Sequence, residues 1–465
     1  MDEIRLRIPA MAVSGSLMKT DANTLDSSRS GSSRGDWIAC HECDLVHTRI
    51  QVSPGNTALC ARCGAVLFRR VSNSIDKAIA FNLSAFLLLI MSNCFTFLTL
   101  EIQGRFVDNY FITGALMLYR TGMGEVGLLV LLTSIVFPFL TVTGMLYILI
   151  PLKFGYRPRQ ITRVYALVCA LRPWSLVSVF LLGVLVSMVK LLELANIIPG
   201  ISMAAFIGLM VMLAVAHVSL DPSVIWQKTR QGKQQESPGV PGKAGEEKYP
   251  APGGDSGPEG RPRWRTAAQL GLVSCHTCGR LVEKGHRHCT GCGSRLHHRK
   301  KGSIQRTWAL LVSAALLFIP ANLYPAMTVH QLGQKGISST IMGGVIHLIQ
   351  DGTLGLAMII FFASIMVPAL KLIILSCLLV SVQKGLAWRP RDRTLLFRVT
   401  EVIGAWSMVD IYVVAVLVGL VNLGVLATIR SEIGMSFFGA VVVLTMLAAM
   451  SFDSRLIWDN AERKR

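Results

Sequence analysis

Two pairs of cysteine hooks are the residues of this chain whose spacing most clearly predicts chemistry. Each hook has the pattern Cys-x-x-Cys, and the four thiolates of two hooks can close a tetrahedron around one metal ion. The loop between hooks has 16 residues in the first pair and 10 in the second. The pattern therefore predicts two zinc ribbons, each holding one structural Zn²⁺. The predicted ligands are Cys40, Cys43, Cys60 and Cys63 in the first ribbon, and Cys275, Cys278, Cys289 and Cys292 in the second.

The residues after the hooks support metal ligation over the alternative of structural disulfides or unconnected thiols. Gly64, Gly279 and Gly293 directly follow three of the four hooks, where a knuckle turn favours a residue without a Cβ. Reduced cysteine hooks are typical of the cytosol, because oxidising compartments convert such thiols to disulfides. A thioredoxin-like redox enzyme would need a βαβ pattern around one hook, and none surrounds these.

Composition places the rest of the chain in a membrane. Hydrophobic residues make up 52% of the 465 residues and charged residues only 16%, which is unlike an ordinary soluble protein. Four long apolar runs follow each ribbon, and about 20 helical residues cross a bilayer. The eight predicted spans are 78–100, 126–152, 173–189, 194–220, 307–329, 352–383, 402–429 and 433–452.

The two halves of the chain repeat each other beyond the cysteines. The string Trp174-Ser-Leu-Val corresponds to Trp406-Ser-Met-Val, Pro138 corresponds to Pro368, and Asn93 to Asn322. We therefore predict a mainly α, polytopic membrane protein, built by tandem duplication of one zinc ribbon plus four transmembrane helices. The predicted parts are a disordered tail (1–36), a first ribbon (37–70), a first four-helix half (71–226), a flexible linker (227–270), a second ribbon (271–300) and a second four-helix half (301–460).

Charge predicts the orientation of these spans. The loop 153–163 carries four basic residues and no acid, and the loop 384–398 carries five basic residues and one acid. The positive-inside rule then puts both termini, both ribbons and the linker in the cytoplasm. The net charge of +19 is thus explained by topology and by contact with anionic membrane lipids. Nucleic-acid binding is disfavoured, because no aromatic stacking surface accompanies the basic residues.

A few ionisable residues fall inside the predicted spans, where charge is costly and usually functional. Lys371 is 12 residues from Gln383, about 18 Å along a helix, and Asp410 has a comparable depth. Lys190 and Glu193 share one helix face, although a turn at 196–200 would let them reach the outer interface instead.

The doubled ribbon and three strings of the second half resemble the paraquat-inducible protein A family, which includes the membrane subunit of the lipophilic envelope-spanning tunnel. The strings are Pro368-Ala-Leu-Lys371, Trp406-Ser-Met-Val-Asp410 and Phe452-Asp-Ser-Arg-Leu-Ile-Trp-Asp459. The resemblance covers about 37–460 and departs from the family in the tail and the linker. It implies a bacterial inner-membrane protein that acts with a periplasmic MCE-domain tunnel protein to move phospholipid or another lipophile. It also implies a polar intramembrane cluster of Lys190, Glu193, Lys371 and Thr445, with Glu193 where a family member has Asp. Thr445 carries no signal of its own, since a membrane Thr usually bonds its own backbone.

Several other functions are weighed against transport. No Walker loop is present, so the chain alone is not expected to pump with ATP. No catalytic constellation lies outside the membrane, so we expect no enzyme. A non-transporting anchor for the tunnel partner, or a redox or stress-response protein with zinc ribbons, remains the alternative. A change in the protonation of the intramembrane groups during the transport cycle would distinguish a proton-coupled transporter from an anchor.

The proline before Lys371 leads to a further prediction about this residue. Because Pro368 removes one helical hydrogen bond just before Lys371, we predict a polar cavity there in which the ammonium can release and regain a proton.

Overall fold

A computed structural model of the chain divides it into two compact units. The first comprises Met1–Ser74 and Leu220–His298, and the second comprises Ile75–Ser219 and Arg299–Arg465. Each unit is described by itself. The structure describes residues 17–19, 37–49, 52–102, 105–191, 196–235, 265–331, 337–350, 352–386, 388–420 and 427–463. Apart from residues 17–19, the predicted tail lies outside this part of the chain, as does most of the predicted linker.

The first unit contains both cysteine regions, in small sheets and turns. A three-stranded sheet has the order β1-β4-β5, and two hairpin-like pairs are formed by β2 with β3 and by β9 with β10. The helix α8 (Pro222–Gln235) also belongs to this unit. The strands are β1 (Leu17–Lys19), β2 (Trp37–Ala39), β3 (Val46–Thr48), β4 (Thr57–Leu59), β5 (Val66–Arg69), β9 (Leu272–Ser274) and β10 (Leu281–Glu283).

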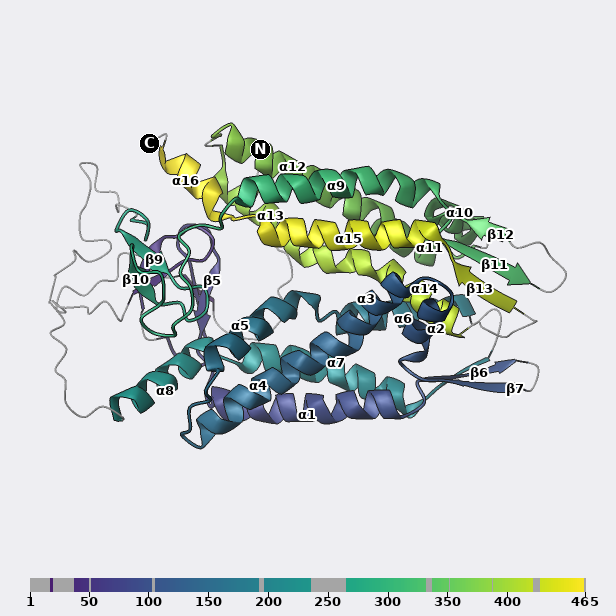
Figure 1. Cartoon of the computed structure of the whole chain (residues 1–465), viewed down its shortest axis with the longest axis horizontal. Coiled ribbons are helices and arrows are strands. Elements are labelled where there is room, and N and C mark those ends of the chain that lie inside the picture. The colour runs from purple at the N-terminus through teal and green to yellow at the C-terminus, as the bar shows by residue number, and fades with distance from the viewer. Residues whose placement is uncertain are drawn as a thin grey trace. The chain divides into compact units, whose positions relative to one another are not determined.

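The second unit is helical and repeats one order of elements twice (Figure 1). The first half contains α1 (Ser74–Cys94), β6 (Leu98–Ile102), β7 (Arg105–Asn109), α2 (Thr113–Arg120), α3 (Gly124–Leu131), the π-helical turn η2 (Leu132–Val136), α4 (Phe137–Lys153), α5 (Ile161–Leu171), the 3₁₀ turn η3 (Arg172–Trp174), α6 (Val177–Leu191), β8 (Asn196–Pro199) and α7 (Ile201–Ser219). The second half contains α9 (Ser303–Leu323), β11 (Met327–Gln331), β12 (Ile337–Ser339), α10 (Ile341–Gln350), α11 (Leu354–Phe361), the π-helical turn η4 (Phe362–Met366), α12 (Val367–Gln383), α13 (Pro390–Gly404), the 3₁₀ turn η5 (Ala405–Met408), α14 (Val409–Leu420), β13 (Ala427–Ser431), α15 (Ile433–Ser451) and α16 (Arg455–Arg463).

Eight helical stretches of the described chain are long and apolar enough to cross a membrane, which confirms the predicted number. Two of them start a full 12 residues earlier than predicted, at Ile161 and at Pro390. Here the helices α5 and α13 continue through 3₁₀ turns into α6 and α14. Charged residues such as Arg163 and Arg398 had excluded these helices from the uncharged runs. The structure confirms a mainly α, multi-span protein with tandem cysteine clusters.

Each half also carries a small antiparallel sheet that the sequence analysis did not predict. The strand orders, β7-β6-β8 and β12-β11-β13, are equivalent, and both sheets lie at the same end of the helical unit (Figure 1). Several predicted features end in these sheets. The predicted spans 78–100, 307–329 and 402–429 finish in β6, β11 and β13, and the expected turn at Asn196 is the strand β8 instead. Leu98 and Leu100 are buried on one face of β6, as the two-residue period of a strand requires.

The core of the helical unit is organised around α14, which contacts helices of both halves. In the span that contains α14, 82% of the apolar window is buried, compared with 33% for the first span. Glycines allow the close approach of its neighbours. A Cβ on Gly183 of α6 would lie 2.7 Å from Cβ of Tyr412, and one on Gly114 of α2 would lie 2.7 Å from the carbonyl oxygen of Ala415. Small residues permit such contacts between helix backbones in membranes.

The duplication extends to individual hydrogen bonds. The backbone N–H of Asp221 donates to Ser74 Oγ at 2.8 Å, and the N–H of Asp453 donates to Ser303 Oγ at 3.0 Å. The amides of Asn93 and Asn322 each donate to the carbonyl four residues earlier, at 2.8 Å in both halves. Equivalent residues therefore perform equivalent structural roles, as expected for two copies of one ancestral half.

Candidate functional site

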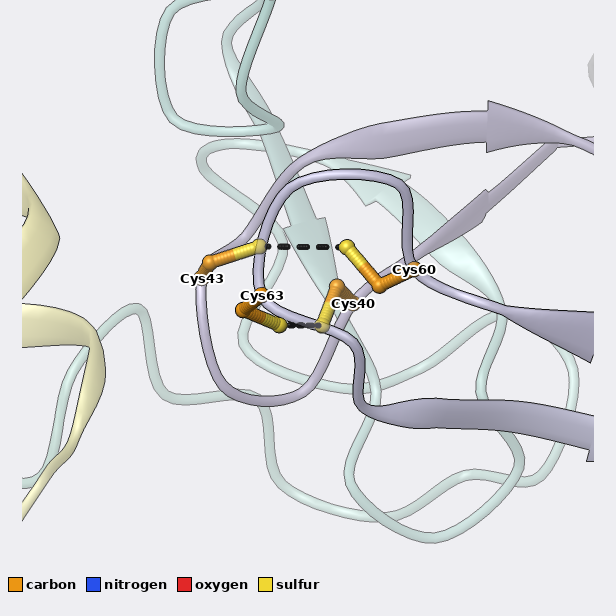
Figure 2. Close-up of side chains that lie close together, drawn as sticks. All are labelled: Cys40, Cys43, Cys60 and Cys63. Atoms are coloured by element: carbon orange, nitrogen blue, oxygen red, sulfur yellow. Dashed lines mark hydrogen bonds between the residues drawn. The ribbon is translucent and has the colours of Figure 1, made fainter. Parts of the chain in front are cut away.

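The eight predicted cysteine ligands form two compact clusters. In the first, Sγ of Cys40 is 3.5 Å from Sγ of Cys63, and Sγ of Cys43 is 3.5 Å from Sγ of Cys60. Figure 2 shows the four side chains pointing toward one another from two facing turns. The corresponding separations in the second cluster are 3.6 Å for Cys275–Cys292 and for Cys278–Cys289. In each cluster all four sulfur atoms lie within 4.8 Å of one another.

These separations fit a bound metal and not a set of disulfides. A tetrahedron with Zn–S bonds of about 2.3 Å has S···S edges of about 3.8 Å, whereas a disulfide bond is about 2.0 Å long. Each quartet can thus supply a complete four-sulfur shell, with no position left for a substrate.

Each hook is held by the same pair of backbone hydrogen bonds. The N–H of the first Cys donates to the carbonyl five residues later, and the N–H of the residue after the second Cys donates back to the first Cys. That residue has a positive φ in all four turns. Gly64, Gly279 and Gly293 occupy it in three of them, as expected, and Asp44 occupies it in the fourth with φ of 61°. Asp tolerates this left-handed conformation better than most residues with a Cβ.

The surroundings of the two clusters differ. In the first, Nε2 of His47 lies 3.3 Å from Sγ of Cys60. In the second, Oγ of Ser294 lies 3.1 Å from Sγ of Cys275 and 3.0 Å from Sγ of Cys292. Polar hydrogens close to thiolates stabilise their charge and orient the ligands. The hook pattern gave no signal for either residue, because both lie outside the two-residue spacers.

The two cysteine regions contact each other directly, which the sequence analysis did not predict. Leu45 and Thr266 form an antiparallel bridge. Asp44 joins the regions twice: its carbonyl accepts the N–H of Ala267 at 2.9 Å, and its carboxylate accepts the N–H of Ala268 at 3.3 Å. A small shared core lies beside these bonds, formed by Trp37, Ala39, Val46, Ala267 and Leu272. The left-handed turn at Asp44 therefore serves both the metal cluster and the contact between the two regions.

A second candidate site surrounds Lys371 inside the helical unit. Lys371 lies on α12 and is only 2% exposed. Its ammonium donates to the carbonyl oxygen of Gly404 at 3.0 Å, and Nζ lies 3.3 Å from the hydroxyl oxygens of both Ser407 and Thr445. A Cβ on Gly404 would be 3.1 Å from Cε of Lys371, so glycine leaves room for the ammonium. All three acceptors are neutral, and the described residues place no carboxylate within ion-pair distance.

The backbone before Lys371 is irregular near the predicted proline break. The π-helical turn η4 ends directly before α12, and the N–H of Val367 donates to the carbonyl of Phe362, five residues back. The first half repeats this arrangement, since the N–H of Phe137 donates to the carbonyl of Leu132. Such π-bulges are frequent at functional sites. The first half has Thr141 where the second half has Lys371, so only one half carries the cation.

The other predicted intramembrane residues either lie apart from the Lys371 cluster or fall outside the part of the chain that the structure describes. Asp410 is buried on α14 and lines a cavity of about 50 Å³ together with Ser339 and Thr340. Lys371 does not line that cavity. Lys190 belongs to the last turn of α6, but its side chain is outside the described part of the chain, and Glu193 is entirely outside it. The structure brings together Lys371 and Thr445, and adds Gly404 and Ser407. Ser407 belongs to the Trp406-Ser string that both halves share, and this repetition was the one sequence feature that could have marked Ser407 as a candidate site residue.

Comparison with known proteins gives consistent matches along the chain. A family model described as Paraquat-inducible protein A matches residues 75–230 and 304–462. Intermembrane transport protein PqiA of Escherichia coli (strain K12) is 31% identical over 425 residues, which cover 91% of this chain and 95% of that protein. Lipophilic envelope-spanning tunnel protein A of the same organism is 27% identical over 430 residues, with 92% of each covered. A probable intermembrane transport protein of Haemophilus influenzae is 26% identical over 438 residues, covering 92% of this chain and 97% of the relative. No solved structure is significantly similar to the chain.

Proposed function

Because the chain belongs to the paraquat-inducible protein A family, we propose that it moves phospholipid or another lipophile across the bacterial envelope from the inner membrane. We propose that it acts with a periplasmic MCE-domain protein that forms the tunnel. The names of the relatives, an intermembrane transport protein and a lipophilic envelope-spanning tunnel protein, support this role. The proposed orientation has both termini and both cysteine regions in the cytoplasm, on the strength of the basic loops.

The environment of Lys371 is the observation that carries the proposal of an active transporter. A buried ammonium among neutral acceptors is costly within a membrane and is rarely retained without a function. Gly404, Ser407 and Thr445 lie on α13, η5 and α15, so the ammonium links three further elements to α12. Loss of its proton would weaken all three contacts at once. We therefore propose that Lys371 couples proton uptake and release to a rearrangement of these helices during lipid movement.

Zinc is the metal that we propose for both cysteine clusters. The four thiolates of each cluster suit Zn²⁺, which would cross-link the two hooks and stabilise the fold of each region. The role is structural, because each shell is complete. Elemental analysis of the purified protein should return two zinc ions per chain. Iron accompanied by a rubredoxin-like absorbance would contradict the assignment.

A complementation experiment tests the role of Lys371. In a strain that lacks the protein and is sensitive to lipophilic agents, Lys371→Ala should fail to restore the envelope barrier, with normal protein level and zinc content. Thr141→Val is the matched control, because Thr141 occupies the same position in the first half and, among the described residues, its hydroxyl bonds only its own helix, through the Pro138 carbonyl at 2.9 Å. It should complement.

The variant Lys371→Met, which keeps an unbranched side chain of nearly the same length, separates charge from packing. Failure of Lys371→Met to complement would support a role for the ammonium. Full complementation would mean that the charge is dispensable, and would favour a non-transporting anchor for the tunnel partner. A strain without the MCE-domain partner should share the phenotype of a strain without this protein. Unrelated phenotypes would remove the support for the pairing.

A further inference from the structure

We propose that two loops of the helical unit bind the headgroups of anionic phospholipids at the membrane surface. The loops carry the strings Tyr156-Arg-Pro-Arg159 and Trp388-Arg-Pro-Arg391, the second of which runs into the first turn of α13, and are called here the first and second aromatic–arginine loops. Each joins the second and third spans of its half. Since four spans separate them, both loops lie on the same side of the membrane. This site is separate from the Lys371 cluster and does not depend on the direction of transport.

Both loops expose aromatic rings directly beside the end of a span. Tyr156 is 74% exposed and Trp388 is 70% exposed, and Phe154 adds a third ring that is 69% exposed. Aromatic residues in such positions prefer the headgroup region, where one end of the side chain meets lipid and the other meets water. The arginines follow immediately in the sequence, so each loop offers rings for the interface and guanidinium groups for phosphate. Arginine recognises phosphate through a planar, bidentate fork.

The start of each loop has a defined conformation, held by backbone hydrogen bonds to the preceding helix. Gly155 and Gly385 lie two residues beyond the ends of α4 and α12, and both have positive φ. The N–H groups of the next residues, Tyr156 and Leu386, donate to carbonyls five residues back, at 2.9 Å and 3.0 Å. In the second loop the buried Arg393 also donates to the Leu386 carbonyl at 2.8 Å. This capping fixes the start of each loop.

The repeated string is not explained by topology alone. The two loops differ in length, with two residues between Gly155 and Pro158 but four between Gly385 and Pro390. Both nevertheless keep an aromatic residue and two arginines around the proline. The positive-inside rule requires only positive charge, at any position. A preserved order of ring, arginine, proline and arginine points instead to a common ligand with an apolar part and an anionic part.

The two loops differ in how much of their charge is already neutralised. Within the described residues, neither Arg157 nor Arg159 has an acidic partner. In the second loop Arg389 lies 3.5 Å from a carboxylate oxygen of Asp392 and stacks over the ring of Trp388, 5.8 Å from its centroid. Arg389 also has φ of 35°, a strained value for a residue with a Cβ. The first loop should therefore bind anionic lipid more tightly than the second.

Native mass spectrometry of the full-length protein in mild detergent tests the proposal, with equal amounts of phosphatidylglycerol and phosphatidylcholine added. The wild-type protein should retain phosphatidylglycerol preferentially. Each arginine near a membrane surface is worth roughly fivefold in affinity for anionic lipid at low salt. Arg157→Gln with Arg159→Gln should therefore reduce the preference strongly, and Arg389→Gln with Arg391→Gln should reduce it less. Asp392→Asn should increase it, because it releases Arg389.

A charge-matched control separates the loops from the overall charge. Arg120→Gln with Lys284→Gln also removes two exposed positive charges, and Tyr119 supplies an exposed ring beside Arg120. This control should keep the wild-type preference. Arg157→Lys with Arg159→Lys should keep an intermediate preference, because the charge remains and the bidentate fork is lost, and this partial retention guards against a loss caused by misfolding. The proposal fails if the control lowers the preference equally, if the first-loop variant keeps it, or if inorganic phosphate alone displaces the bound lipid.

Discussion

Asp44 shows how one residue serves two structural purposes. Its left-handed backbone closes the first hook around the metal cluster, and its carbonyl and carboxylate hold Ala267 and Ala268 of the second cysteine region. The other three hooks have glycine at this position. Glycine would relieve the backbone but would lose the carboxylate contact. We therefore attribute the departure from glycine to the contact between the two regions.

Replacing Asp44 should weaken metal retention in the first cluster. Asp44→Ala keeps a Cβ at positive φ and removes the hydrogen bond to Ala268, at a cost of about 1–2 kcal/mol. Zinc should therefore pass to a chromophoric chelator faster than from the wild-type protein, with the second cluster less affected. Asp44→Asn, which keeps an acceptor oxygen and tolerates the left-handed region, is the matched control and should release zinc at nearly the wild-type rate. Equal rates for all three proteins would contradict the double role.

Asp453 is a second residue whose environment makes a measurable prediction. It lies between α15 and α16, and is buried with Arg455, whose Nε and Nη2 are each 3.0 Å from a carboxylate oxygen. Burial raises the pKa of Asp453, but hydrogen bonds from Arg455 and from backbone amides outweigh it and lower the pKa from 3.8 to about 2. The lowered value means that the carboxylate stabilises the fold above its unfolded pKa, and that this contribution is lost as the pH falls toward about 2.

Asp453→Asn should thus lower the thermal unfolding midpoint by the same amount at about pH 5 and about pH 8. The expected loss is about 3 kcal/mol, because Arg455 would be left buried without its counterion. Asp221→Asn is the equivalent change in the first half, where Ser223 stands in place of Arg455, and it should cost much less. A cost that grew between these two pH values would be inconsistent with a lowered pKa.

At the scale of elements, paired helices of the two halves differ in how closely they are packed. Gly114 on α2 meets the backbone of α14, whereas its counterpart Gly344 on α10 has open space where a Cβ would be. Substitution by alanine should therefore have opposite effects. Gly114→Ala should destabilise the helical unit by about 1–3 kcal/mol through overpacking. Gly344→Ala should stabilise it by about 0.5–1 kcal/mol through helix propensity.

Thermal unfolding of the two glycine variants in the same detergent provides the measurement. Each variant serves as the control for the other, because both replace glycine by alanine at equivalent positions of the two halves. Destabilisation by both variants would indicate that the open space beside Gly344 is filled in the membrane. Stabilisation by both would show that the contact between α2 and α14 is loose.

The sequence predicted elements well where a single physical signal dominates. Apolar runs predicted the number of spans, and cysteine spacing predicted the ligand quartets. Helices α5 and α13 were missed as parts of spans because their charged residues interrupt the apolar runs. The neighbours of Lys371 were mostly missed because the 3₁₀ turn η5 changes the helical phase between Gly404 and Ser407, and no periodic pattern reports such a change. The contact between the cysteine regions joins residues more than 200 positions apart, which spacing alone cannot reveal.

At the scale of the whole molecule, duplication and charge together predict one topology. Reporter fusions at Gly232 and Arg465 should give a cytoplasmic signal, and a fusion at Gly104 should give a periplasmic signal. The reason is that four spans return each half to its starting side and the basic loops face the cytoplasm. A periplasmic signal at Gly232 would overturn both the even number of spans and the parallel orientation of the halves.

The bridge between Leu45 and Thr266 also constrains the order of biosynthesis. Residues 37–49 leave the ribosome early, but the bridge partner Thr266 and two of the five residues of the shared core arrive only after about 220 further residues have been translated. Throughout the insertion of the first four spans, Trp37 and Val46 therefore lack the neighbours that bury them. Completion of the first cysteine region thus follows completion of the first membrane half, so an arrested or truncated translation product would present an unfinished apolar edge to the quality-control machinery of the cell.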